Sequence, residues 1–183
     1  MYAFLYADRI SMGFENRNLW KEWLKGNLRD VMLMRYIQQL RKYELIYNRY
    51  HQKGGLLNAI LFIIAKHHFM RLSCNLSIHI SPNSLGPGAK IVHPGYIWID
   101  GSSRIGKNCT MLPRVLLGKK HPGIEPPCIF IGDNCYIGTG VTILGPIKIG
   151  NNVTIGAGAV VVKDVPDNCV VAGNPAKVIK YKQ

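Results

Sequence analysis

The sequence has little negative charge and no closely spaced cysteines. Its 183 residues include 23 Lys and Arg against 10 Asp and Glu, which gives a formal net charge of +13. No two cysteines stand in a CxxC pair, which argues against a disulfide framework and against a cysteine metal site. We expect the cysteines to be small buried side chains; they are Cys74, Cys109, Cys128, Cys135 and Cys169.

The sequence also lacks a long hydrophobic run and a recognisable leader. Its longest apolar run, LLNAILFIIA, covers ten residues from Leu56 to Ala65 and contains Asn58. A helix that spans a bilayer needs about 20 residues, so a buried helix is expected here. The opening residues, MYAFLYADRI, lack the basic start, long apolar run and cleavage site of a signal peptide. We therefore expect a cytoplasmic protein.

Most of the positive charge falls in the N-terminal part of the chain. Between Arg17 and Arg71 there are 11 Lys or Arg and 3 acidic residues, a net charge of +8. Such a field suits an anionic partner, such as a membrane surface, cofactor phosphates or an acidic glycan. No RNA- or DNA-binding motif accompanies the charge, so no nucleic-acid partner is expected. A solvated helix surface explains the same charge without any partner.

The segment from about residue 16 to residue 71 is predicted to be helical. Asn27 is a plausible N-cap for a helix that starts at Leu28, and Gly54-Gly55 ends that helix. Apolar residues at spacings of three and four make this helix one-sided. The next segment, LLNAILFIIAKHHFMRL, is apolar nearly all round, so we expect it to be a buried helix. Residues 1–74 are accordingly interpreted as an N-terminal helical region.

After Leu76 an aliphatic residue recurs every six positions. One series is Ile99, Ile105, Met111 and Leu117, and a second is Ile131, Ile137, Ile143, Ile149, Ile155 and Val161. A small or aliphatic residue stands two positions before each of them, and glycine often follows. Neither a helix nor simple strand alternation has this period, which is typical of a hexapeptide β-solenoid with three hexads per triangular coil.

Two features interrupt or extend this period. The stretch GKKHPGIEPPCIF, at residues 118–130, shifts the phase by two and should project from the solenoid as a loop. Counting back six positions from Ile99 leads to His93, which predicts an imidazole in a slot that aliphatic residues fill elsewhere. His93 is therefore a candidate functional residue.

Four motifs of the solenoid occur together in one known family. They are SPNSLGPGAKIVHPG at 81–95, the repeated IGxxx hexads, KKHPG in the loop, and IGAGAVVVKDVPDNCVVAGNPAKVIK at 155–180. With them the chain resembles the left-handed β-helix acyltransferases of the hexapeptide superfamily, especially serine acetyltransferases and relatives encoded with capsular polysaccharide genes. The resemblance implies a mainly β chain with a left-handed parallel β-helix at 75–183 and an extruded loop. It also implies a homotrimer, with active sites in the grooves between neighbouring prisms.

The resemblance implies acetyl-CoA as the acyl donor, no metal, and the following site residues. His93 matches the catalytic histidine of serine acetyltransferases, and His121 matches a second active-site histidine. His121-Pro122 also matches the galactoside and maltose acetyltransferase branch, in which the loop histidine is the base. We favour His93 as the base and leave the alternative open. The implied cofactor-binding residues are Thr139, Ala157, Val162, Lys163, Lys177 and Lys180.

Three departures from the family pattern bear on the acceptor. His79 stands where the family has the aspartate that orients the catalytic imidazole, and Asp100 is a possible substitute. Val92 stands where the family has an aspartate that helps to bind serine, and the C-terminal isoleucine that docks into cysteine synthase is absent. These departures favour a sugar hydroxyl of capsular or exopolysaccharide synthesis over serine as the acceptor.

Two further interpretations stay open alongside acetyl transfer. The histidines at 79, 93 and 121 could hold zinc, as in β-helix carbonic anhydrases, although the closely spaced histidine pair of that family is missing. The solenoid could also be a non-enzymatic assembly scaffold. For an enzyme, the basic helical region suggests peripheral association with the inner membrane face, near a lipid-linked glycan.

Overall fold

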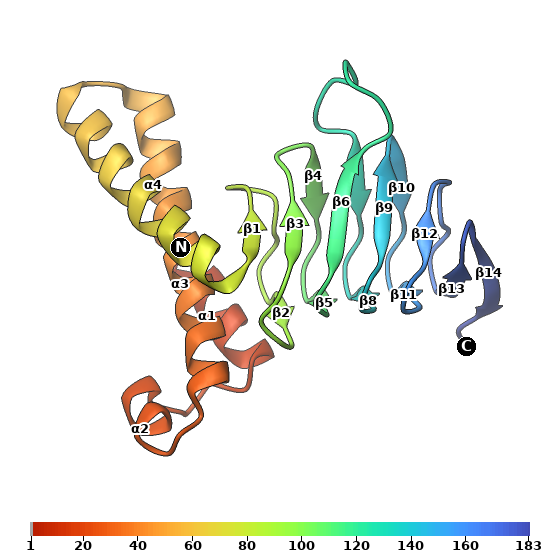
Figure 1. Ribbon diagram of the computed structural model, residues 1–183, viewed down its shortest axis with the longest axis horizontal. Coiled ribbons are helices and arrows are strands. Elements are labelled where there is room, and N and C mark those ends of the chain that lie inside the picture. Colours follow the sequence, from red (N-terminus) through yellow and green to blue (C-terminus); the bar gives the residue numbers. More distant parts are fainter. Residues whose placement is uncertain (1) are drawn as a thin grey trace.

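The structure is a computed structural model and describes residues 2–183. Four helices come first in the chain and form an arm beside a triangular prism (Figure 1). They are α1 (Tyr2–Ser11), α2 (Leu19–Leu24), α3 (Leu28–Lys53) and α4 (Leu56–Leu76). None of the helices within the described residues is long and apolar enough to cross a membrane. The helix α1 lies ahead of the segment from about residue 16 to 71 that was predicted to be helical, but within the region 1–74 that was interpreted as helical.

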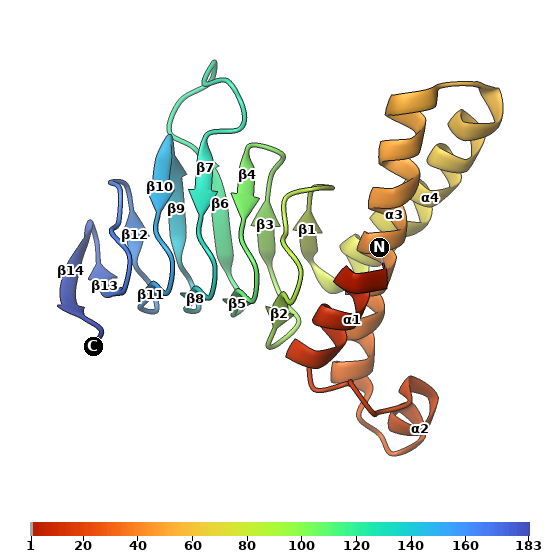
Figure 2. The same ribbon diagram turned by 180° about the vertical axis from the view of Figure 1, so that it is seen from behind.

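The prism is a left-handed β-helix with three faces, and nearly all neighbouring strands on each face run parallel (Figures 1 and 2). Face A consists of β1 (Ile78–Ile80), β3 (Ile97–Ile99), β6 (Val115–Lys119), β9 (Thr142–Gly145) and β12 (Val160–Val161). Face B consists of β4 (Ser103–Ile105), β7 (Ile129–Ile131) and β10 (Ile147–Ile149). Face C consists of β2 (Lys90–Ile91), β5 (Thr110–Met111), β8 (Tyr136–Ile137), β11 (Thr154–Ile155), β13 (Cys169–Gly173) and β14 (Ala176–Tyr181). The final pair, β13 and β14, is antiparallel and closes the C-terminal end.

The six-residue period produces these faces as predicted. Residues of the aliphatic series are buried in the prism, and Ile99, Met111 and Ile143 are fully buried. Consecutive coils pair with an 18-residue offset, as in Ile131 with Ile149. Several corners require a left-handed backbone, which asparagine adopts more readily than most residues. The corner asparagines with φ between 53° and 62° are Asn83, Asn108, Asn134, Asn152 and Asn168.

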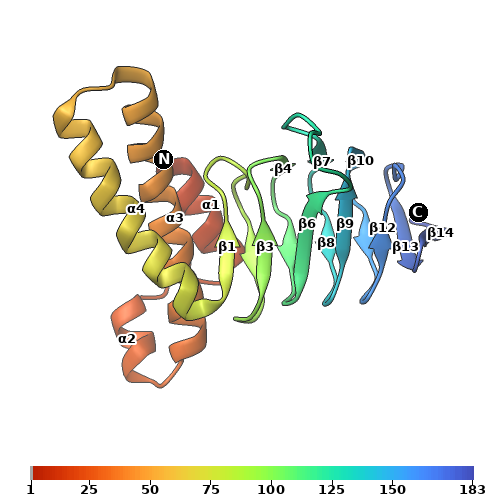
Figure 3. The same cartoon turned by 45° about the horizontal axis from the view of Figure 1, so that its top comes forward.

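The predicted loop is also confirmed. Leu117 pairs with Ile143, 26 residues later in the chain, so the coil there contains eight residues beyond the usual 18. The extra residues leave the prism between β6 and β7 and form the projecting loop in Figures 1 and 3. An insertion at one corner therefore causes the phase shift of two positions seen in the sequence.

The prediction that His93 occupies an interior position of the solenoid is wrong. The strand partner of Met111 is Ile91, which fills the interior position in the first coil. Ile99 comes eight positions after Ile91, whereas Leu117 comes six positions after Met111. The two additional residues lie in the corner between β2 and β3, and His93 stands exposed in that corner. The chain accommodates an imidazole there because the position faces solvent rather than the core.

The helical region packs against the first coil, with one unexpected feature. The one-sided packing predicted for α3 is confirmed, since Val31, Met34 and Ile37 are buried. The prediction that α4 is buried is wrong, because only Phe69, Ser73 and Leu76 are buried in it. Its outer face is turned away from α3 and the prism, which also leaves Cys74 exposed, unlike the other four cysteines. The helix continues to Leu76, and Ser77 forms the boundary with the prism.

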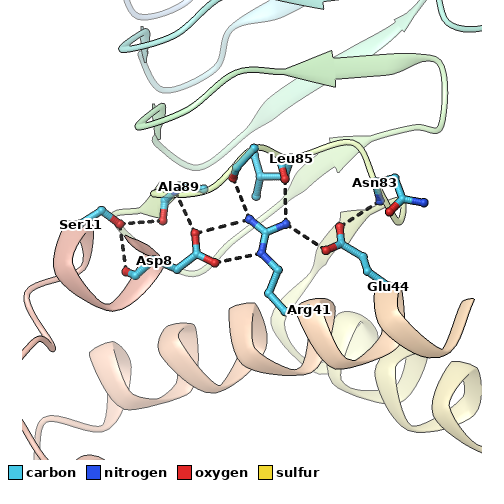
Figure 4. A network of polar contacts seen from close by, with 8 residues as sticks. Asp8, Ser11, Arg41, Glu44, Asn83, Leu85 and Ala89 are labelled. Carbon is cyan, nitrogen blue, oxygen red and sulfur yellow. Dashed lines mark hydrogen bonds and ion pairs between the residues drawn. The ribbon is translucent and has the colours of Figure 1, made fainter. Parts of the chain in front are cut away.

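A buried arginine joins the helices to the prism (Figure 4). The Arg41 guanidinium donates from Nε to Asp8 Oδ2 at 2.9 Å and from Nη1 to Glu44 Oε2 at 3.0 Å. It also donates to the backbone carbonyls of Leu85 and Gly86, both at 2.7 Å. The side chain of Arg41 is 2% exposed and that of Asp8 is fully buried. Both carboxylates and two carbonyls of the first coil therefore share one cation.

The two carboxylates also bind backbone amides of the first coil. Asp8 Oδ1 accepts from the Ala89 amide at 3.1 Å, and Glu44 Oε1 accepts from the Asn83 amide at 2.9 Å. A solenoid needs a cap at its end, because the last coil has no neighbour to satisfy its backbone groups. Here α1 and α3 supply that cap through charged side chains.

We expect replacement of Arg41 by alanine to lower the free energy of unfolding by about 3–5 kcal/mol, because it leaves two buried carboxylates without their cation. Urea denaturation at neutral pH measures the change. Lys42→Ala is the control, since the neighbouring Lys42 is exposed on the same helix, and it should change stability by about 0.5 kcal/mol or less. Equal losses in the two variants would contradict this role of Arg41.

Candidate active site

One edge of the prism carries His93 and two of the predicted cofactor-binding residues. This edge, called the C–A edge here, consists of the corners that lead from face C to face A. His93 lies in the corner of the first coil, Thr139 in that of the third and Ala157 in that of the fourth. Successive corners are joined directly: Thr139 Oγ1 donates to the Pro113 carbonyl at 2.8 Å, and the Gly158 amide donates to the Thr139 carbonyl at 2.8 Å.

The residues along the C–A edge have small side chains, so backbone peptide groups form much of its surface. A Cβ added to Gly138 would lie 2.8 Å from the Ala157 amide nitrogen, closer than packed atoms approach. Glycine at 138 therefore allows consecutive corners to stack. The resulting ridge presents peptide groups of Thr139 and Ala157 with little side-chain cover, which is the kind of surface against which a thin ligand chain can lie.

The opposite edge of face A carries the loop and the second histidine. This A–B edge consists of the corners that lead from face A to face B, and the extruded loop with His121 leaves the prism there. Lys120 anchors the base of the loop, since its Nζ donates to the Val162 carbonyl at 2.7 Å. Val162 and Lys163 follow β12 on the same edge, while the side chain of His121 is exposed.

A single chain therefore does not bring His93 and His121 together. They stand at opposite edges of face A, and a strand such as β6, with five residues, covers about 16 Å. The predicted cofactor-binding residues are divided in the same way. Thr139 and Ala157 lie on the C–A edge, and Val162 and Lys163 lie on the A–B edge.

The last two predicted cofactor-binding residues lie at the end of the prism. Lys177 and Lys180 belong to β14, which pairs with β13 at the C-terminal end of face C. Both lysine side chains are exposed. They can meet an anion, because an ammonium on a flexible stem acts as a mobile point charge.

The two candidate orienting residues are engaged away from His93. The His79 ring stacks on Trp98, with 4.3 Å between the ring centroids. Burial lowers the pKa of His79 while the charge of Asp100 acts to raise it, and the balance favours the neutral imidazole. Asp100 Oδ1 accepts from the Ser102 amide at 3.0 Å and also from the Ser102 hydroxyl. Within residues 2–183 neither side chain is hydrogen-bonded to His93.

The polar partner of His93 is a residue that the sequence did not reveal. Arg29, in the first turn of α3, places Nη1 3.3 Å from His93 Nδ1. Its Nε donates to Asp30 Oδ1 at 2.8 Å. Because a guanidinium can only donate, the Nδ1 atom of a neutral His93 must accept, which leaves the ring proton on Nε2. The two residues are 64 positions apart, and no local motif marks Arg29.

The residues predicted as alternative zinc ligands are also dispersed. His79 lies in the middle of a strand on face A, His93 at one edge and His121 in the loop at the other. Within residues 2–183 no three His, Cys, Asp or Glu side chains gather in an arrangement that could hold a metal ion.

Comparison with known proteins agrees with this architecture. Residues 129–163 match the family model described as bacterial transferase hexapeptide (six repeats). The serine acetyltransferase of Synechococcus elongatus is 37% identical over 119 residues, which cover 61% of this chain and 46% of that protein. The Mycobacterium tuberculosis serine acetyltransferase is 37% identical over 133 residues, which cover 68% of this chain and 54% of that protein. The chain thus spans about half the length of these two relatives.

The fold likeness extends over the whole chain. The crystal structure of Neisseria gonorrhoeae serine acetyltransferase superposes with a TM-score of 0.75 at 28% sequence identity. The match covers 98% of this chain, helices included, and 66% of that protein. The prism is therefore a hexapeptide-repeat left-handed β-helix. The chain is similar to the serine acetyltransferases in sequence over 61% to 68% of its length and in fold over 98% of it.

Proposed function

We propose that this chain is an acetyl-CoA-dependent O-acetyltransferase whose acceptor is the hydroxyl of serine, and that it works as a homotrimer in the cytoplasm. The observation that carries the proposal is the distribution of the matched residues over two edges of the prism. Serine replaces the sugar favoured by the sequence departures, because serine acetyltransferases match this chain over 61% to 68% of its length in sequence and over 98% in fold. The proposed product is a precursor for cysteine synthesis.

The proposed active site is a groove between neighbouring prisms. Within one chain the C–A and A–B edges point in different directions. In a cyclic trimer, the C–A edge of each chain can face the A–B edge of the next. His93 of one protomer then lies across a groove from His121 of its neighbour, and both sets of cofactor-binding residues line that groove. One trimer has three such grooves.

In this groove His93 acts as the general base. A serine hydroxyl is a poor nucleophile, so a neutral imidazole must remove its proton as the oxygen attacks the thioester carbonyl. The tetrahedral intermediate carries a negative oxygen, which His121 or backbone amides of the groove can stabilise by donating hydrogen bonds. Collapse of the intermediate breaks the C–S bond, and the proton held by His93 passes to the departing thiolate. No covalent enzyme intermediate is required.

Coenzyme A is proposed to lie along the C–A edge. The pantetheine arm can run beside the peptide groups of Thr139 and Ala157, where small residues leave the backbone uncovered. The phosphates of the nucleotide then fall near lysines of the neighbouring chain's A–B edge and of the terminal hairpin, and the candidates are Lys163, Lys177 and Lys180. Val162 contributes to the wall of the groove through its backbone, whose carbonyl holds Lys120.

Arg29 must release His93 before the ring can accept a proton at Nδ1. Both Arg29 and His93 are exposed, and such an exposed contact is weak, so the release costs about 1 kcal/mol or less. We therefore expect Arg29→Ala to change kcat for acetyl transfer by about threefold or less. Steady-state kinetics at saturating acetyl-CoA measures this. A fall of more than about tenfold would mean that Arg29 is needed to position the base.

A sugar acceptor is the second candidate, and one feature of face A favours it. Tyr96 and Trp98 are 46% and 42% exposed beside the corner that holds His93. With His79 they line a pocket of about 370 Å³ between face A and α4. Exposed aromatic rings of this kind suit the apolar face of a pyranose. Val92, which replaces the aspartate of the serine-binding pattern, agrees with this alternative.

Thiol release from acetyl-CoA separates the proposed acceptors. The purified protein is incubated with acetyl-CoA and either serine or a panel of free and nucleotide-linked sugars. Serine-dependent release with a rate at least tenfold above every sugar supports serine acetylation, and the reverse order supports the sugar alternative. The absence of acceptor-dependent release with all of them, together with an intact trimer, would favour a structural role for the prism.

A further inference from the structure

No element within residues 2–183 covers the outer face of α4, and the half of that face near the hairpin tip is apolar. At 100° per residue, its exposed side chains occupy about half of the helix circumference. Leu56 and Leu57, at the tip of the hairpin, are 80% and 68% exposed, and Ile63 and Ile64 are 63% and 61% exposed. Single exposed apolar residues are common, but a continuous group of this kind marks a binding surface.

Apolar and basic side chains are segregated along α4. The half near the hairpin tip exposes only apolar large side chains, which are Leu56, Leu57, Ile60, Leu61, Ile63 and Ile64. The half nearer the prism exposes Lys66, His67, His68 and Arg71. Figure 1 shows the tip as the part of the hairpin farthest from the prism. Arg49 and Lys53 of α3 are also exposed near the tip. No residue of α4 is acidic.

Acidic side chains nearby do not neutralise this surface. The three acidic residues between Arg17 and Arg71 are paired inside the helical region: Glu22 with Arg17 and Lys25, Asp30 with Arg29, and Glu44 with Arg41. Hydrogen bonds from Arg17 and Asn27 lower the pKa of Glu22 to about 2. Within residues 2–183 no ion pair engages Arg49, Lys53, Lys66 or Arg71.

We propose that the α3–α4 hairpin binds the surface of an anionic lipid membrane, with its apolar tip among the acyl chains and its basic residues at the headgroups. The order of side chains along the hairpin matches the order of environments across a leaflet, since apolar residues come first and cations lie behind them. A peripheral attachment is sufficient, because the exposed segment from Leu56 to Ile64 is far shorter than a bilayer-spanning helix.

Charge complementarity distinguishes lipid from a second copy of the chain. Two α4 faces that met each other would bury Lys66 and Arg71 of both copies in one contact, and neither helix has a carboxylate to pair them. An anionic leaflet provides the opposite charge over the whole face and also accepts the apolar tip. The inference does not depend on the acetyl acceptor or on any catalytic residue.

Vesicle flotation tests the proposal with the intact chain of residues 1–183. Vesicles of phosphatidylcholine alone are compared with vesicles that contain roughly 30% phosphatidylglycerol, at low and at high salt. We expect binding to the anionic vesicles, weakening as salt screens the charges, and little binding to the neutral ones. The triple variant K53E/K66E/R71E should weaken the partition into anionic vesicles by at least about 100-fold. The variant L56S/L57S/I60S/I64S should remove the binding that survives at high salt.

A charge-matched control and two other readouts make the outcome decisive. K90E/K107E/K148E makes the same change of charge on exposed lysines of the prism and should alter the partition by about threefold or less. Circular dichroism verifies that each variant is folded, and sedimentation gives its assembly mass. Failure of the wild type to bind anionic vesicles, or equal losses in the two triple variants, would overturn the proposal. So would a fall in assembly mass of the serine variant without a change in vesicle binding, since a second copy would then cover α4.

Discussion

Replacing His93 with alanine is expected to lower kcat for acetyl transfer by about 100- to 10,000-fold, the usual contribution of a general base. Without the imidazole, the attacking hydroxyl must lose its proton to water as the C–O bond forms. The ring of His93 is exposed in its corner, so its loss should leave the fold and the KM for acetyl-CoA nearly unchanged. Initial rates of thiol release, with the melting temperature of each variant, measure both effects.

The control is another exposed histidine. His51→Ala removes an imidazole from α3 that stacks on Tyr47, far along the hairpin from the prism, and should leave kcat unchanged. His121→Ala separates the two possible bases. If His121 stabilises the oxyanion, its loss costs about 100- to 1,000-fold. If it is the base instead, His121→Ala will cost more than His93→Ala, and His93→Ala will retain most of the wild-type rate.

The sequence was sufficient to predict the prism because a solenoid repeats one local rule. Each hexad places an aliphatic side chain inside and turns at a small residue, and neighbouring coils repeat the same contacts. Ile131, Ile149 and their equivalents therefore reveal the faces without any knowledge of distant contacts. An insertion is visible in the same way. The period of six holds before and after the loop, and the eight additional residues shift the phase of the second series by two positions.

The same reasoning failed where the period breaks without a visible boundary. The corner with His93 contains two additional residues, but Ile91 and Ile97 also stand six apart, so counting backwards kept an apparent phase. Only the pairing of Ile91 with Met111 reveals the slip. A histidine that seemed to occupy an interior slot is instead a solvent-facing side chain on an edge, which is the better place for a base that must meet a substrate.

Contacts between the helices and the prism could not be predicted from the sequence. Arg29 is 64 positions from His93, and Arg41 is 44 and 45 positions from the carbonyls of Leu85 and Gly86 that it binds. Such pairs depend on how two elements of different period dock, and neither period encodes that geometry. The exposure of α4 was missed for a different reason: an apolar helix predicts burial, but no element within residues 2–183 covers the outer face of α4.

A complementation experiment tests whether each active site is shared between two chains, as proposed. We expect co-expression of the His93→Ala and His121→Ala variants to restore activity that neither variant has alone. In a randomly mixed cyclic trimer, about a quarter of the grooves combine an intact His93 from one chain with an intact His121 from the next. The mixture should therefore recover about a quarter of the wild-type kcat per groove, against a residual rate of one hundredth or less in each variant alone.

The matched control uses the His93→Ala variant co-expressed with the double variant that lacks both histidines. No groove in that mixture contains His93, so its activity should stay at the level of His93→Ala alone. Differently tagged chains and tandem purification remove the homotrimers. Each mixed trimer has one intact groove of three, so the expected recovery then rises from a quarter to a third of the wild-type kcat per groove. If mixed trimers are obtained and show no more activity than the parent variants, the two histidines do not act across a groove. His93 would then work with residues of its own edge, and the loop with His121 would have to be assigned another role.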